Sequence, residues 1–178
     1  LISFKTISGK NNSSLINYCE DILTKCGASS FKVFDEEKKR VNLFATLKAK
    51  KPNGLESIIL SGHTDVVPVS KGWSTDPFVA EIKEDKLYGR GSCDMKGFLA
   101  CSLAFAEIFS QSNLSRDIHF SLTFDEETAC IGGGRCEHTV PPPALSVPPI
   151  VVSPTTGGPL VKRKLACLLY TSPSPRDS

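Results

Sequence analysis

The order of apolar segments constrains the fold of this 178-residue chain more than any other feature. Residues 57–61 (SIILS) form a short, continuous apolar run, which is typical of a strand buried on both faces. Other strand-like segments alternate with two segments whose apolar residues recur at helical spacing. This alternation predicts an α/β fold with a mixed, partly parallel sheet flanked by helices.

Two helices stand out in the sequence. The clearer one is predicted over residues 94–110, with Asp94 placed to cap its first turn. The other is predicted over residues 12–26, with Asn12 or Ser13 as the N-cap. Strands are expected at residues 31–33, 41–47, 57–61 and 118–124, and a hairpin is expected at residues 78–82 and 86–88.

The composition changes abruptly near residue 135. Nine of the 12 prolines lie beyond residue 140, and residues 138–178 hold a single acid, Asp177, against four bases. Proline removes a backbone donor and clashes with the preceding turn, so a continued helix is excluded there. We expect residues 1–134 to be one ordered unit and residues 135–178 to be a proline-rich tail, either aberrant or disordered. Because the only methionine is Met95, the chain is expected to be a piece of a longer protein.

Composition also excludes several classes of protein. A net charge of +2 without a clustered basic patch argues against nucleic-acid binding, and no apolar run approaches the roughly 20 residues of a membrane span. The seven cysteines include no C-x-x-C pair, which favours reduced thiols in a cytoplasmic protein. Cys130, Cys136 and His138 do not match the spacing of a common structural zinc site.

The first candidate site segment, residues 61–68 (SGHTDVVP), leaves the buried strand at its carboxyl end. Open α/β sheets bind ligands at such strand ends. Asp65 can hydrogen-bond one ring nitrogen of His63 and leave the other nitrogen for a metal. An incidental loop histidine is the alternative explanation.

Two further segments carry carboxylates. In residues 88–97 (YGRGSCDMKG), Asp94 can serve as a metal ligand, as a helix cap, or as both. Asp125, Glu126 and Glu127 follow a predicted strand directly, and three adjacent carboxylates repel one another unless a cation is present. A solvated acidic turn would explain the triplet alone. Together, the three strand-end segments predict a metal site.

These segments resemble the signature segments of the M20 metallopeptidase family, and the resemblance covers residues 1–134. Within that family, the run from residue 2 to residue 98 is most similar to the acetylornithine deacetylases. The resemblance implies a zinc-peptidase-like catalytic domain, of which residues 1–134 are the N-terminal part. It also implies two zinc ions, with Co²⁺ as a possible substitute, and an intact protein that forms a homodimer.

The resemblance implies a role for each candidate residue. His63 would hold one zinc ion, Glu127 the other, and Asp94 would bridge both. Glu126 would be the general base, and Asp65 would orient His63. The implied reaction hydrolyses a small N-acyl amino acid, N-acetylornithine, in arginine biosynthesis. The alternatives are a succinyl-diaminopimelate desuccinylase, another M20 amidohydrolase, or a non-catalytic fragment.

The sequence departs from the family pattern in its last part. A weaker similarity to the family, the family echo, recurs at residues 151–164. However, residues 152–155 (VSPT) lack the acidic ligand of the family's S/G-E-P-T segment. The final histidine ligand and the dimerisation domain of the family would lie beyond residue 178. The chain by itself is therefore expected to be inactive.

Overall fold

The structure is a computed structural model that describes residues 1–129 and the two-residue strand at 150–151. The expectations for Cys130, Cys136 and His138 lie outside the described residues. The same holds for the predicted tail and the family echo, except at residues 150–151.

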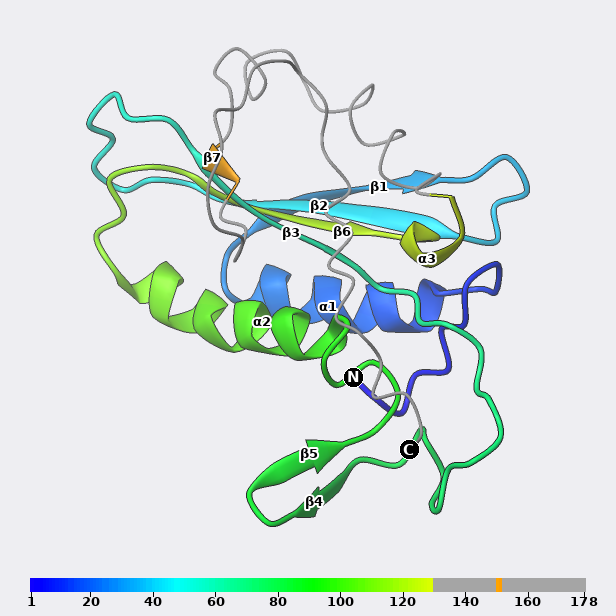
Figure 1. The fold of residues 1–178 in the computed structure, drawn as a ribbon. Coiled ribbons are helices and arrows are strands. Elements are labelled where there is room, and N and C mark those ends of the chain that lie inside the picture. Colours follow the sequence, from blue (N-terminus) through cyan, green and yellow to red (C-terminus); the bar gives the residue numbers. More distant parts are fainter. Residues whose placement is uncertain (130–149, 152–178) are drawn as a thin grey trace, which may run out of the picture.

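A five-stranded sheet forms the centre of the fold, with the strand order β1-β2-β6-β3-β7 (Figure 1). The first three strands of that order pair antiparallel, whereas β6, β3 and β7 pair parallel. The predicted mixed, partly parallel sheet is therefore confirmed. The strands are β1 (Ser29–Phe34), β2 (Val41–Leu47), β3 (Ile58–His63), β6 (Ile118–Thr123) and β7 (Ile150–Val151).

The two long helices, α1 (Ser13–Lys25) and α2 (Lys96–Gln111), lie side by side on one face of the sheet (Figure 1). Alternate residues of the central strands point at these helices, because successive strand side chains project to opposite faces. The resulting core is fully buried and apolar, which provides the main driving force for folding. It includes Leu15, Ile16 and Leu23 of α1, Leu99 and Leu103 of α2, and Leu43, Ala45, Phe120 and Leu122 of the strands.

The register of β3 and β6 decides where the candidate site forms. The two strands run parallel with His63 opposite Thr123, so both end at the same edge of the sheet. A four-residue helix, α3 (Glu126–Ala129), follows β6 at this edge. Residues 88–95 lead from the small hairpin of β4 (Glu81–Lys83) and β5 (Lys86–Tyr88) into α2.

Some predicted element boundaries were wrong. Helix α2 begins at Lys96 with Met95 at the N-cap position, and no side chain caps it, so Asp94 is not the cap. Asn12 does occupy the N-cap position of α1, but its side chain bonds Val41 and Thr64 instead. The first hairpin strand is β4, so it begins at residue 81 rather than at residue 78.

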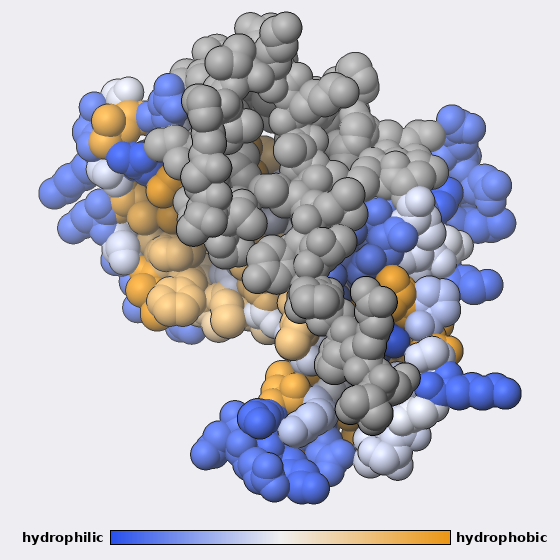
Figure 2. Space-filling model, in the orientation of Figure 1, coloured by the Kyte–Doolittle hydropathy of each residue, from blue (hydrophilic) through white to orange (hydrophobic). Residues whose placement is uncertain are grey.

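The outer face of α2 carries apolar side chains. Phe105 and Ile108 are each more than half exposed, and Figure 2 shows apolar surface over this helix. Among residues 1–129, no helix is long and apolar enough to cross a membrane. The four cysteines in this range are free thiols.

Candidate metal centre

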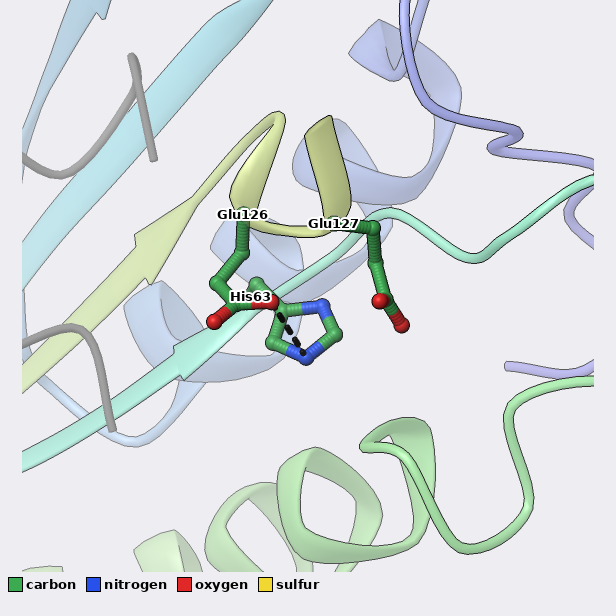
Figure 3. A group of neighbouring side chains, drawn as sticks. All are labelled: His63, Glu126 and Glu127. Atoms are coloured by element: carbon green, nitrogen blue, oxygen red, sulfur yellow. Dashed lines mark ion pairs between the residues drawn. The ribbon is translucent and has the colours of Figure 1, made fainter. Parts of the chain in front are cut away.

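The structure brings the three predicted segments together at the carboxyl edge of the sheet. His63 is the last residue of β3, and Glu126 and Glu127 open α3 just after β6. Asp94 reaches the same place from the loop that precedes α2, and its Oδ1 lies 3.0 Å from His63 Nε2. Figure 3 shows the imidazole of His63 between the side chains of Glu126 and Glu127.

The hydrogen bonds of His63 place a hydrogen on one nitrogen of its ring. Its Nδ1 lies 3.0 Å from the backbone oxygen of Asp65, and a carbonyl only accepts, so Nδ1 carries the hydrogen. In a neutral ring, Nε2 is then a lone pair. That nitrogen faces Asp94 and also lies 3.8 Å from Oε2 of Glu126. A lone pair directed at carboxylates is unfavourable unless a proton or a cation lies between them.

The pKa values show that the site carries excess negative charge. Burial alone lowers the pKa of His63, but hydrogen bonds and charge from Asp65, Asp94 and Glu126 raise it to about 9. Burial, followed by the negative charge of Asp94, raises the pKa of Glu127. A bound cation would favour the neutral ring of His63 and the ionised carboxylate of Glu127, because its positive charge lowers both pKa values.

His63, Glu126 and Glu127 offer ligand atoms that all lie within 4.8 Å of one another. An imidazole nitrogen and carboxylate oxygens are ligands that zinc takes in catalytic sites, so the residues fit a zinc ion. Asp94, a predicted ligand, contacts His63 but lies outside this compact group, and its side chain is 56% exposed. Glu126, predicted to be the general base, lies inside the group.

Asp65 has more partners than the sequence predicted. Nδ1 of the His63 ring bonds the backbone oxygen of Asp65 at 3.0 Å, while the Asp65 carboxylate lies 3.5 Å from the same nitrogen. That carboxylate accepts hydrogen bonds from Ser8 Oγ (2.7 Å) and from the amides of Glu126 (3.1 Å) and Glu127 (3.2 Å). Asp65 therefore positions both His63 and the turn that carries Glu126 and Glu127.

The charged state of Asp65 follows from these contacts. Burial raises the pKa of the Asp65 carboxyl, but hydrogen bonds from His63 and Ser8, with the charge of His63, lower it overall. The group thus stays ionised and keeps its capacity to accept several hydrogen bonds at once.

Sequence reasoning missed the polar residues that join the strand ends. Asn42 is fully buried, and its Oδ1 accepts the amide of Phe124 at 3.0 Å. Thr64 binds the backbone oxygen of Thr123 through both its amide and its hydroxyl, each at 2.8 Å. An asparagine inside the apolar strand VNLFATL is a signal that could have identified Asn42.

Lys96 was also missed as a structural residue. It is 1% exposed, and its Nζ donates to the backbone oxygen of Phe4 at 2.5 Å. Burial lowers the pKa of Lys96 to about 8. The side chain therefore ties the N-terminal segment to the loop that carries Asp94.

Residues 59–143 match the pattern of the family described as Peptidase family M20/M25/M40. These residues therefore carry the pattern of the M20 peptidase family. The match includes His63, Asp94 and the Glu126–Glu127 pair, so the family resemblance expected from the sequence is confirmed.

Curated relatives carry two different names. The chain is 39% identical over 144 residues to a succinyl-diaminopimelate desuccinylase of Rickettsia bellii, with 78% of the chain covered. It is 38% identical over 125 residues to an acetylornithine deacetylase of Proteus mirabilis, with 69% covered. The chain spans only about a third of these relatives, 34% and 31% of their lengths.

Two solved structures share the fold. Human carnosine dipeptidase 1 aligns with a TM-score of 0.62 at 23% identity, covering 73% of this chain and 31% of that one. An M20 family metallo-carboxypeptidase from Sulfolobus solfataricus aligns with a TM-score of 0.62 at 25% identity, covering 74% and 30%. The predicted zinc-peptidase-like fold class is thus confirmed.

Proposed function

We propose that residues 1–134 are the N-terminal part of the catalytic domain of a zinc-dependent M20 amidohydrolase. The observation that carries this proposal is the convergence of His63, Glu126 and Glu127 within 4.8 Å, with Asp94 against the histidine. These side chains come from three separate segments, and only the carboxyl edge of the sheet brings them together.

In the proposed centre, His63, Asp94 and Glu127 would hold a pair of zinc ions. Asp94 would contribute to both, and Co²⁺ is an alternative metal. The carboxylate of Asp94, which lies 3.0 Å from His63 Nε2, is close enough to share a ligand shell with the histidine. When bound, zinc supplies Lewis acidity toward the amide carbonyl and toward water.

Glu126 is the proposed general base. Its carboxylate accepts a proton from water as the water oxygen adds to the amide carbon, and it returns the proton to the departing amine. The C–N bond breaks, which leaves a carboxylate and a free amine. The bond from the Glu126 amide to Asp65 fixes the backbone from which this side chain extends.

For the substrate, we propose N-acetylornithine, which would give ornithine and acetate. The support is the similarity of residues 2–98 to acetylornithine deacetylases, and a relative with that name covers 69% of the chain. Succinyl-diaminopimelate desuccinylase is the second candidate, since relatives with that name match at similar identity. We propose a cytoplasmic, homodimeric parent protein that acts on small N-acyl amino acids.

Zinc binding by the 178-residue chain tests the metal centre. Calorimetric titration with Zn²⁺ is expected to show binding that His63→Ala and Asp94→Ala each weaken at least tenfold. A matched control is Asp76→Ala, which removes a carboxylate from the loop between β3 and β4. Full zinc affinity in Asp94→Ala would refute the shared role of Asp94. Absence of any binding by the unchanged chain would favour the inert-fragment alternative.

A chimera tests the chemistry. Residues 1–134 replace the matching segment of the Proteus mirabilis acetylornithine deacetylase, and hydrolysis of N-acetylornithine is measured. Glu126→Gln in this chimera should keep its zinc content but lose about 10²–10⁴-fold in kcat, because an amide cannot accept the proton. If zinc content falls with activity, Glu126 is a ligand and the roles of Glu126 and Glu127 are exchanged.

A second chimera separates the two substrates. The same residues replace the matching segment of the Rickettsia bellii desuccinylase, and each chimera is compared with its own parent. The deacetylase chimera should retain the larger share of kcat/KM. A larger share in the desuccinylase chimera would overturn the acetylornithine proposal in favour of N-succinyl-diaminopimelate.

A further inference from the structure

A partly buried ion-pair chain connects the β1–β2 hairpin to the metal centre. Arg40, the residue before β2, donates from Nε to Oδ2 of Asp35 at 2.7 Å and from Nη1 to Oδ2 of Asp125. Both acceptor side chains are buried, with exposures of 2% for Asp35 and 3% for Asp125. A single guanidinium thus neutralises two carboxylates that lie far apart in the sequence.

The position of Arg40 is fixed by its own surroundings. Oδ1 of Asp35 accepts the amides of Lys39 (2.7 Å) and Arg40 (3.0 Å), which shapes the turn between β1 and β2. The guanidinium carbon lies 5.3 Å from the centre of the Phe124 ring, a cation–π distance. Arg40 therefore binds Asp125 from a fixed position, unlike a mobile side chain at the surface.

Asp125 is the residue at which the chain turns from β6 into α3. Its φ is 55°, a left-handed conformation that is energetically unfavourable for residues other than glycine, although aspartate tolerates it better than most. Its Oδ1 accepts the amide of Gly9 at 2.8 Å, while Oδ2 binds Arg40. These bonds hold the turn that aims the amides of the next two residues at Asp65.

We propose that Arg40 is a positioning residue of the metal centre, acting through Asp125 on the turn that carries Glu126 and Glu127. This inference rests on the proposed function, because it assigns Arg40 to the same centre. Without the guanidinium, Asp35 and Asp125 are two buried carboxylates of like charge without their shared cation. Asp125 then moves toward water, and the adjoining glutamates leave their places beside His63.

Amide hydrogen exchange of the metal-free 178-residue chain tests the positioning directly. Arg40→Met should speed exchange of the Glu126 and Glu127 amides at least tenfold, while the ladder amides of Ala45 and Phe120 keep their protection. The matched control is Lys39→Met, which removes the same charge one residue earlier. Lys39 is 68% exposed and pairs with Glu37 on the surface, so its loss should leave all these amides unchanged.

A merely stabilising ion pair predicts a different result. Equal acceleration at the turn and in the ladder would show that Arg40 acts on global stability, and no acceleration would show no role. Either result overturns the proposal. Asp125→Asn serves as a milder second variant, because asparagine keeps the shape, tolerates the left-handed conformation and can still accept from Gly9. It should accelerate the same two amides.

Zinc titration of the same variants links the turn to the centre. Arg40→Met and Asp125→Asn should each weaken Zn²⁺ binding at least tenfold, and Lys39→Met should stay within twofold of the unchanged chain. Unaltered zinc affinity in Arg40→Met would overturn the assignment of Arg40 to the centre. If the unchanged chain binds no zinc, the proposed function fails, whereas the exchange data still decide whether Arg40 positions the turn.

Discussion

Replacing Asp65 with alanine should destabilise the chain strongly. The carboxylate accepts three hydrogen bonds, from Ser8, Glu126 and Glu127, in a side chain that is 4% exposed. A hydrogen bond to a charged group contributes about 1.5–3 kcal/mol, and such contributions are not additive in one network. Because the loss also leaves the donors unpaired, we expect a decrease of about 3–5 kcal/mol in the free energy of unfolding.

Urea unfolding at pH 7, followed by circular dichroism, measures this change. With a slope of about 2 kcal/mol/M, the Asp65→Ala midpoint should fall by about 2 M. Asp65→Asn should cost less, about 1–3 kcal/mol, because the amide oxygen still accepts one bond while its NH₂ group cannot accept the others. Asp21→Ala, an exposed carboxylate on α1, is the control and should change stability by no more than about 0.5 kcal/mol.

The pH dependence gives a second check. The folded-state pKa of Asp65 is lowered, so its contribution is present above the unfolded value of about 3.9 and is lost as pH falls through the folded value. The stability difference between the unchanged chain and Asp65→Asn should therefore shrink below about pH 4. An equal urea midpoint for the two proteins at pH 7 would refute the inference that Asp65 holds the turn.

Four further outcomes are expected. Gly97→Ala should destabilise the chain by about 1–3 kcal/mol or more in urea, since the added Cβ would lie 2.3 Å from the backbone oxygen of Ser92. Phe120→Ala should cost about 3–5 kcal/mol in the same assay, because the ring is fully buried in the core. Burial raises the pKa of Asp117, but hydrogen bonds from Lys48 and the Ala49 amide lower it overall, so its ionised form stabilises the fold. Asp117→Asn should therefore lose less stability than the unchanged chain when the pH is lowered below about 4 in acid titrations. Zinc at 100 times its dissociation constant should stabilise the chain by about 2.7 kcal/mol in thermal unfolding, and EDTA should reverse the effect.

Local sequence patterns were sufficient to predict the elements and the candidate segments. The apolar run at residues 57–61 and the helical spacing after Asp94 each depend on residues close together in the chain, so β3 and α2 were found at nearly the right places. The role of Asp94 as a cap was wrong, because capping preference is local whereas its carboxylate is turned to His63, 31 residues away.

The sequence by itself thus determined the alternation of strands and helices, the strand ends where polar residues gather, and the family. Only the tertiary structure decided which donors these polar residues bind. Arg40 and Asp125 form an ion pair although they are 85 residues apart in the sequence, and Asp65 accepts a hydrogen bond from the Glu126 amide, 61 residues away. No local periodicity encodes such contacts, because they arise when the register of β3 and β6 brings two strand ends to one edge and burial requires their polar groups to be paired.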